Sequence, residues 1–193
     1  MLIDTPVREL LAAFASPDPT PGGGSAAALA ASIGASLLLM VARLPKTRSN
    51  SPEDRAALEA AAMRLTGAQQ QLADAIDADT AAYRDVVAAY KLPKATDDQK
   101  RDRTAAVQRA LRGATDVPLA VMRLSAAALR DGQIVARHGH AAAASDAGVA
   151  AALLRAGLEG ARLNVEINLQ SNDDQAYVDA VRTEVARLVA ASE

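Results

Sequence analysis

An aspartate interrupts an otherwise apolar seam in the longest predicted helix, and its residue type suits it to catalysis. Leucines stand seven residues apart at Leu58, Leu65 and Leu72, and the next position in that register is Asp79. This spacing predicts a core-facing seam, where an unpaired carboxylate costs on the order of several kcal/mol. Such a residue serves an ion pair with an interior Arg or Lys, a structural hydrogen bond, or chemistry. We predict that Asp79 is a general acid and base, and that Asp77, which points away from the seam, is solvated.

A glycine turn opens a helix that carries few side chains larger than alanine in its first half. The turn reads Thr20-Pro21-Gly22-Gly23-Gly24-Ser25, and no polar face follows it before Arg43. A helix that is apolar on every side is a buried one, and a helix start offers free N–H groups and a positive dipole end to an anion. The alternative is a tight turn before a close-packed core helix. The residues expected to contact a small anionic ligand are Pro21, Gly22, Gly23, Gly24 and Ser25.

Other polar residues are candidates for ligand contact. Asn164 and Asn168 lie four apart, so they share one helix face, and apolar residues flank them. Their amides are expected to bind either a polar ligand or backbone groups. Ser145-Asp146 indicates first a helix cap and second a ligand contact. Lys94, just after a predicted helix end, either neutralises an anion or is a solvated surface lysine.

The two histidines do not form a metal-binding pattern. His138 and His140 are separated by Gly139, the chain has no cysteine, and no Glu-x-x-His motif is present. We predict a flexible loop here. No metal site and no tightly bound cofactor is expected.

Helical periodicity accounts for most of the chain, and no stretch alternates with period two for long. The predicted fold is all-α: a single-domain helical bundle, residues 1–193, around a buried Ala-rich central helix. Capping signals begin two of the helices, at Ser51-Pro52 and at Thr96 with Gln99 three residues later. The expected helices cover 5–15, 25–44, 52–91, 96–112, 116–138, 147–157, 160–169 and 173–190.

Composition narrows the functional class. Half of the 193 residues are hydrophobic but only 2% are aromatic, so each buried residue removes little area from water, which favours a large interface or an oligomer. Acidic and basic residues number 23 and 21, which argues against a nucleic-acid platform. The N-terminus shows no signal peptide and the apolar run after Ser25 is short for a membrane span. We therefore expect a cytoplasmic, soluble protein.

Six motifs in register resemble the cyclodeaminase/cyclohydrolase family of tetrahydrofolate enzymes. The resemblance covers nearly the whole chain. The motifs are Thr20-Pro21-Gly22-Gly23-Gly24-Ser25 with its Ala-rich helix, Asp77-Ala78-Asp79 followed by Tyr83, Leu92-Pro93-Lys94-Ala95-Thr96, Ala114-Thr115-Asp116-Val117-Pro118-Leu119, Ser145-Asp146, and Asn164-Val165-Glu166-Ile167-Asn168-Leu169.

The resemblance implies an all-helical homodimer that binds a folate, with Asp79 as catalytic acid. The glycine turn would face the ligand, with Lys94, Asn164 and Asn168 nearby. The implied activity is cyclodeamination, an ammonia-lyase reaction that converts 5-formiminotetrahydrofolate to 5,10-methenyltetrahydrofolate. The alternatives are a methenyltetrahydrofolate cyclohydrolase, which gives 10-formyltetrahydrofolate, and a non-catalytic helical dimer that binds folate or a protein partner. Neither reaction needs a metal or a redox cofactor.

Overall fold

Six α-helices and two short 3-10 helices make up the computed structural model, which describes residues 1–192. No β-strand occurs in that range, so the predicted all-α class is confirmed. The 3-10 helices are η1 (Leu2–Asp4) and η2 (Ala141–Ala143). The α-helices are α1 (Val7–Phe14), α2 (Gly23–Ala42), α3 (Pro52–Tyr90), α4 (Asp97–His138), α5 (Ala144–Leu169) and α6 (Gln175–Ala190).

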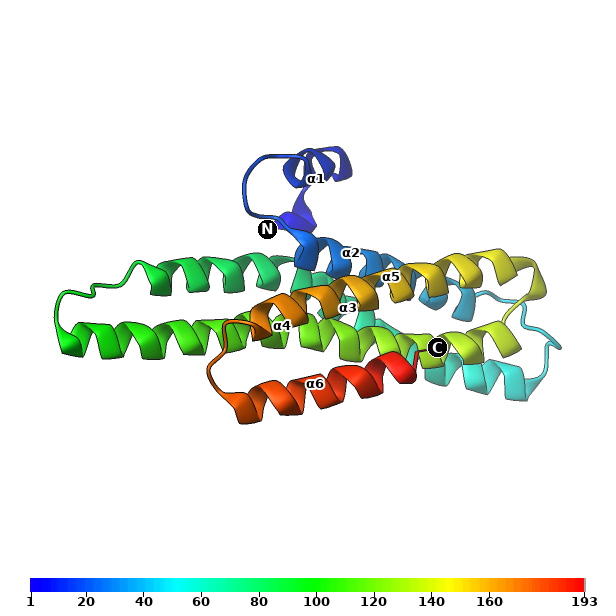
Figure 1. Ribbon diagram of the computed structural model, residues 1–193. Helices are drawn as coiled ribbons and strands as arrows, with labels where there is room; N and C mark the ends of the chain where they lie inside the picture. Colours follow the sequence, from blue (N-terminus) through cyan, green and yellow to red (C-terminus); the bar gives the residue numbers. More distant parts are fainter. Residues whose placement is uncertain (193) are drawn as a thin grey trace.

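Helices α2, α3, α4 and α5 form a lengthwise bundle, and α2 contacts the other three (Figure 1). The α3–α4 hairpin extends past the bundle as an arm, which has its own small cluster of Ala89, Val107 and Leu111. Helix α6 lies along α4, and α1 stands off the bundle beside the start of α2. The long seam is confirmed, because Leu58, Leu65 and Leu72 are fully buried. In this arrangement the middle of α3 lies beside the start of α2.

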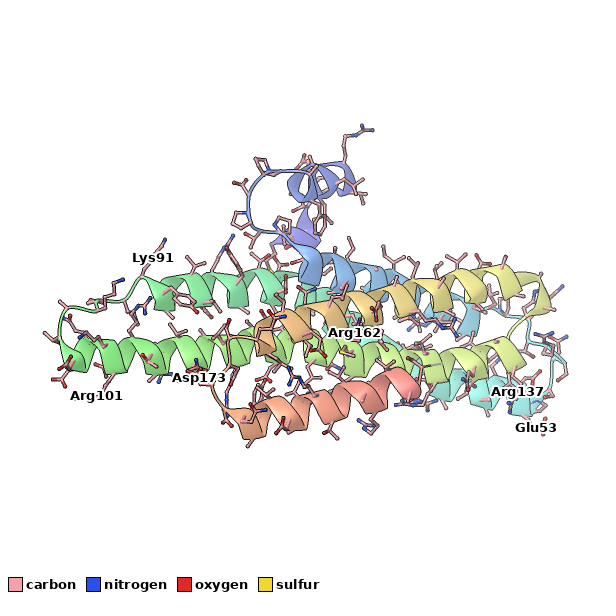
Figure 2. The ribbon with its side chains drawn as sticks, in the orientation of Figure 1. Glu53, Lys91, Arg101, Arg137, Arg162 and Asp173 are labelled. Atoms are coloured by element: carbon pink, nitrogen blue, oxygen red, sulfur yellow. The ribbon has the colours of Figure 1, made fainter. Side chains whose placement is uncertain are left out.

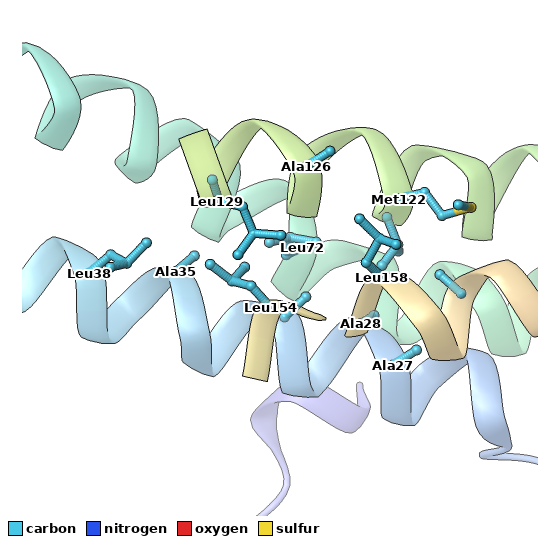
Figure 3. Packing of buried hydrophobic residues seen from close by; sticks show 14 of the residues in the cluster. Ala27, Ala28, Ala35, Leu38, Leu72, Met122, Ala126, Leu129, Leu154 and Leu158 are labelled. Atoms are coloured by element: carbon cyan, nitrogen blue, oxygen red, sulfur yellow. The ribbon is translucent and has the colours of Figure 1, made fainter. Parts of the chain in front are cut away.

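Small residues let α2 and α5 approach each other closely. Figure 3 shows alanines of α2 in one buried cluster with leucines of α5. A Cβ on Gly157 would lie 2.7 Å from the Cβ of Ala31, and one on Gly34 would lie 2.8 Å from the Ala150 carbonyl oxygen. These glycines are therefore required by packing. The predicted interruption of α5 between residues 157 and 160 is wrong for this reason: Gly157 lies inside a continuous helix, where neighbouring contacts offset its low helix propensity.

The predicted helix boundary between residues 112 and 116 is also wrong, because α4 continues through Pro118. A proline normally disrupts a helix by removing one hydrogen bond and crowding the carbonyl four residues earlier. Here a side chain of α5 provides the missing donor: Asn168 Nδ2 donates to the Ala114 carbonyl oxygen at 2.7 Å. Tertiary structure thus compensates for a break that is expected from local sequence.

Two of the three predicted caps are present. Ser51 Oγ accepts from the Asp54 N–H at 3.1 Å, and Thr96 and Gln99 form a reciprocal capping box. Ser145 does not cap α5: the helix is preceded by η2 and begins one residue earlier, at Ala144, with Ala143 in the capping position. Ser145 and Asp146 therefore lie within the first turn of α5.

One stripe of α2 remains uncovered in a single chain. The Ala-rich central helix is confirmed, but Ile33 and Met40 are 45% and 40% exposed. By length and composition alone, α2 and the segment Ala141–Leu169 could each cross a membrane. Of the most apolar window of each, 56% is buried inside the bundle for α2 and 33% for Ala141–Leu169.

A buried carboxylate fastens the α2–α3 connection to the end of α4. Asp54 Oδ1 lies 2.8 Å from His138 Nδ1, and Asp54 Oδ2 accepts from the Ser49 N–H and Oγ, both at 2.7 Å. The His138 hydrogen bond, followed by those from Ser49, holds the pKa of Asp54 far below its ordinary value. The flexible loop predicted around His138 is therefore wrong, since its ring is held by Asp54. No group of His, Cys, Asp and Glu side chains suited to a metal ion occurs among residues 1–192.

We expect Asp54→Asn to lower the melting temperature by several degrees at neutral pH, because the amide cannot replace the charge-assisted bonds. A carboxyl with a depressed folded-state pKa contributes stability above its ordinary pKa and loses it as pH falls through the folded-state value. Thermal melts from pH 7 down to pH 2 should show a steeper decline below about pH 4 for the wild type than for Asp54→Asn. Asp85→Asn, at an exposed position of α3, is the matched control and should follow the wild type. Identical acid limbs for the wild type and Asp54→Asn would contradict this assignment.

Candidate active site

Asp79 lies against the start of α2. Gly22, the residue before that helix, has no side chain that could cap it. The Asp79 carboxylate, on the neighbouring helix α3, caps it instead. Asp79 Oδ2 accepts from the Ser25 N–H at 2.8 Å. Ser25 Oγ lies 2.9 Å from both Asp79 Oδ2 and the Ile76 carbonyl oxygen, and its one proton serves one acceptor at a time. Asp79 is thus oriented by a helix N-terminus, which favours negative charge.

The other carboxylate oxygen of Asp79 lies directly over Gly24. A Cβ built on Gly24 would lie 2.0 Å from Asp79 Oδ1, closer than any real contact. The demands at the neighbouring glycines are milder: a Cβ on Gly22 would lie 3.5 Å from the Pro19 carbonyl oxygen, and one on Gly23 would lie 3.5 Å from Asn164 Nδ2. Of the three glycines, Gly24 alone is dictated by the position of the aspartate.

Asp79 lacks a permanent positive partner. Within residues 1–192, no Lys, Arg or His forms an ion pair with it, whereas Asp131 is paired with Arg64 at 2.6 Å. Oδ1 accepts no hydrogen bond from this part of the chain. The alternative that Asp79 pairs with an interior Arg or Lys is therefore wrong for the described residues. The Asp79 carboxylate has one oxygen held by Ser25 and one available to a ligand.

A hollow of about 270 Å³ opens between the glycine turn, α3, α4 and the end of α5. Among residues 1–192, Asp79 is the only charged residue that lines it. Such a hollow suits a flat, uncharged or cationic group. The lining residues are Pro19, Thr20, Gly22, Gly23, Gly24, Asp79, Ala82, Tyr83, Val86, Leu111, Ala114, Asn164 and Asn168.

A second hollow of similar size, about 280 Å³, lies toward the opposite end of α5 and has different chemistry. Arg130, Gln133 and Arg155 are among its lining residues, and no carboxylate lines it within the described chain. It offers no group that can accept a proton near neutral pH, because arginine stays charged. We therefore identify the Asp79 hollow as the candidate active site.

Asn164 and Asn168 both reach the Asp79 hollow, and both are partly committed to backbone groups. Asn164 Nδ2 donates to the Gly160 carbonyl oxygen at 2.8 Å, and Asn168 Nδ2 to that of Ala114 at 2.7 Å. Each amide keeps its oxygen and one N–H for another partner. The two readings made for this pair, a ligand contact and a structural bond, are thus compatible.

The remaining predicted residues lie outside the hollow. Pro21 borders a neighbouring recess, Ser25 is buried behind Asp79, and Lys94 is exposed on the α3–α4 connection. Figure 2 labels Lys91 and Arg101 near the same end of the arm. Ser145 and Asp146 begin α5, and nineteen residues of helix, about 28 Å, separate Ser145 from Asn164. The structure does not bring these two residues to Asp79 within one chain.

The carboxylate of Asp77 is not simply solvated, contrary to prediction. It accepts hydrogen bonds from the Leu2 N–H at 2.6 Å and the Ile3 N–H at 3.2 Å. Asp77 therefore fastens η1 to α3. Asp77 and Asp79 thus accept hydrogen bonds from two different elements: Asp77 from η1 and Asp79 from the start of α2.

Sequence reasoning did not select several apolar lining residues. Ala82, Tyr83 and Val86 follow Asp79 at spacings of three, four and seven, which is one helical face. That spacing could have identified them once Asp79 was chosen. Leu111 comes from α4, and no local signal connects it to α3.

The fold and the site together define a class of protein: a helical bundle in which one carboxylate faces a hollow beside a helix that begins with glycines. A family model described as formiminotransferase-cyclodeaminase matches residues 6–187. The chain belongs to this family.

Curated relatives and a solved structure agree with that assignment. A methenyltetrahydrofolate cyclohydrolase of Methylorubrum extorquens is 39% identical over 95% of this chain and 88% of its own length. A formimidoyltransferase-cyclodeaminase of Sus scrofa is 35% identical over 97% of this chain, which spans only 35% of that longer protein. The crystal structure of a formiminotetrahydrofolate cyclodeaminase from Thermotoga maritima superimposes with a TM-score of 0.88, at 24% identity, over all of this chain and 92% of that one. This likeness shows the fold.

We expect Gly24→Ala to lower the melting temperature, although alanine is favoured over glycine in a helix by about 1 kcal/mol. The new methyl group must displace Asp79 and with it the Ser25 hydrogen bond. The matched control is Gly113→Ala in α4, where an added Cβ meets nothing within 4 Å and stability should rise slightly. Equal melting temperatures for Gly24→Ala and the wild type would show that Asp79 does not occupy this position.

Proposed function

We propose that this chain is a folate one-carbon enzyme that acts at the 5,10-methenyltetrahydrofolate ring, with Asp79 as its general acid and base. The observation that supports the proposal most directly is the uncommitted Oδ1 of Asp79, in a hollow that no other charged residue of the described chain lines. The methenyl ring is cationic, and a carboxylate beside it stabilises positive charge as it forms. The names of the relatives supply the substrate class.

In the cyclodeaminase reaction, the formimino nitrogen of 5-formiminotetrahydrofolate first takes up one proton from solvent. N10 then attacks the formimino carbon, which forms the N10–C bond. Asp79 takes the N10 proton and returns it to the departing nitrogen. The C–N bond to that nitrogen breaks, and ammonia leaves as the five-membered methenyl ring closes. One carboxylate can perform both proton transfers in sequence.

The cyclohydrolase reaction is the second candidate. Water adds to the methenyl carbon while Asp79 accepts its proton, the N5–C bond then breaks with protonation of N5, and 10-formyltetrahydrofolate results with net release of one proton. This candidate is favoured by the 39% identity to a cyclohydrolase that has nearly the same extent as this chain. Assays of purified protein with 5-formimino- and 5,10-methenyltetrahydrofolate, reading ammonia and ring absorbance, distinguish the two: turnover of the first with ammonia release identifies a cyclodeaminase.

The substrate contacts follow from the same geometry. The ring would lie against Gly23 and Gly24, with the amides of Asn164 and Asn168 as polar contacts. The anionic glutamate tail would extend along the arm toward Lys94, since no cation lines the hollow within the described chain. Ser145 and Asp146 can join such a site only from a second copy of the chain. The cytoplasmic location stays a prediction.

We expect Asp79→Asn to lower turnover at least about a hundredfold, the lower end for a lost general acid or base. The amide oxygen can still accept from Ser25, so the fold should persist, as read by circular dichroism. Asp77→Asn is the matched control. It removes the same charge two residues before Asp79, from a carboxyl that does not line the hollow. Near-normal turnover of Asp79→Asn would remove the catalytic assignment.

We also propose that two copies associate through the uncovered apolar stripe of α2. Ala26, Ala30, Ile33, Leu37 and Met40 recur at helical spacing on its outer side and none carries a charge. An exposed apolar face of this kind would pair with the same face of a second copy about a two-fold axis. Neighbouring α5 adds Val149, Leu163 and Ile167, all more than half exposed.

Light scattering after size exclusion tests this association. Ile33→Lys should convert a dimer to a monomer, because a charge would be buried in an apolar interface. Met63→Lys places the same charge on α3 at a methionine that is 72% exposed and should leave the dimer intact. A monomeric wild type would contradict the proposal.

A further inference from the structure

The hydrogen bond between Asn168 and Ala114 has a specific cause in the sequence of α4. Pro118 lies inside that helix and has no N–H, so the carbonyl of Ala114, four residues earlier, lacks its helical donor. Pro118 is buried, which limits access of water to this turn. A carbonyl in such a place requires another donor.

Asn168 of α5 provides that donor. Its Nδ2 lies 2.7 Å from the Ala114 carbonyl oxygen, and both residues line the Asp79 hollow. The interaction therefore joins α4 to α5 at the wall of the candidate active site. It also fixes the direction of the amide, because only the nitrogen can face a carbonyl oxygen.

Asn164 offers an instructive contrast. Its Nδ2 donates to the carbonyl of Gly160, four residues earlier in the same helix, which is also the normal acceptor for the Asn164 backbone N–H. This side-chain bond is redundant for the backbone. The loss of Asn164 leaves no carbonyl without a donor, whereas the loss of Asn168 does.

We propose that Pro118 is a positioning residue for substrate binding, acting through Asn168. By freeing the Ala114 carbonyl, Pro118 holds the Asn168 amide in one orientation, with its oxygen and second N–H left for the ligand. The side chain is then ordered before the ligand arrives, so binding does not incur the entropic cost of ordering it. This role rests on the proposed function of the hollow.

A double-mutant cycle in thermal stability tests the coupling without any substrate. In a chain of this size, Asn168→Ala should lower the melting temperature by about 2–4 °C or more, because the Ala114 carbonyl then has no hydrogen-bond donor. In a Pro118→Ala background the backbone N–H of residue 118 can serve Ala114, and Asn168→Ala should change the melting temperature by less than about 1 °C. Asn164→Ala is the control and should give equal shifts in both backgrounds. Equal shifts for Asn168→Ala would overturn the coupling.

The functional arm separates positioning from a merely structural role. Pro118→Ala keeps Asn168 but releases its amide, so KM for the folate substrate should rise about three- to tenfold, the cost of ordering one side chain, with kcat changed less than about twofold. Calorimetry with 5-formyltetrahydrofolate as a non-reacting probe should show the same loss in Kd. An unchanged KM in an active enzyme would overturn the positioning role alone. A wild type that turned over neither folate would contradict the proposed function, while the stability cycle would still measure the coupling.

Discussion

The contact between the Asp79 carboxylate and the start of α2 is the constraint on which the site depends. Asp79 Oδ2 accepts the Ser25 N–H, and Oδ1 lies where a side chain on Gly24 would have to be. The helix gains a cap that its own glycines cannot provide, and the aspartate gains a fixed orientation and a favourable dipole. Because the same interaction orders both partners, the acidic group and the turn that exposes it are held as one unit.

Small residues have two consequences for the rest of the molecule. They allow α2 and α5 to approach so closely that Gly34 and Gly157 have no room for a methyl group. The same composition gives each helix little area to bury, and one side of α2 remains apolar and open. The close packing that positions the site and the uncovered stripe proposed as a dimer surface thus share one origin.

Much of the fold was predictable because its signals are local. The heptad leucines of α3, the Ser51 cap and the Thr96–Gln99 capping box depend on residues within one or two turns of each other. The errors occurred where distant contacts decide the outcome. Pro118 continues a helix because Asn168 supplies a donor, and Gly157 continues another because α2 lies against it. No window along α4 or α5 contains that information.

The candidate site divides in the same way. Several parts of the site were identifiable from the sequence: the aspartate in the leucine seam, the three consecutive glycines and the two asparagines on one helix face. Residue type shows which groups are costly to bury, and helical spacing shows which residues share a face. Only the tertiary structure decided that Gly24 alone is dictated by Asp79, that Leu111 and Ala114 complete the wall, and that Ser145 and Asp146 lie about 28 Å of helix away from Asn164. The physical reason is that a hollow forms between helices, and its walls depend on how rigid rods cross and approach, which a period of 3.6 residues along one rod does not encode.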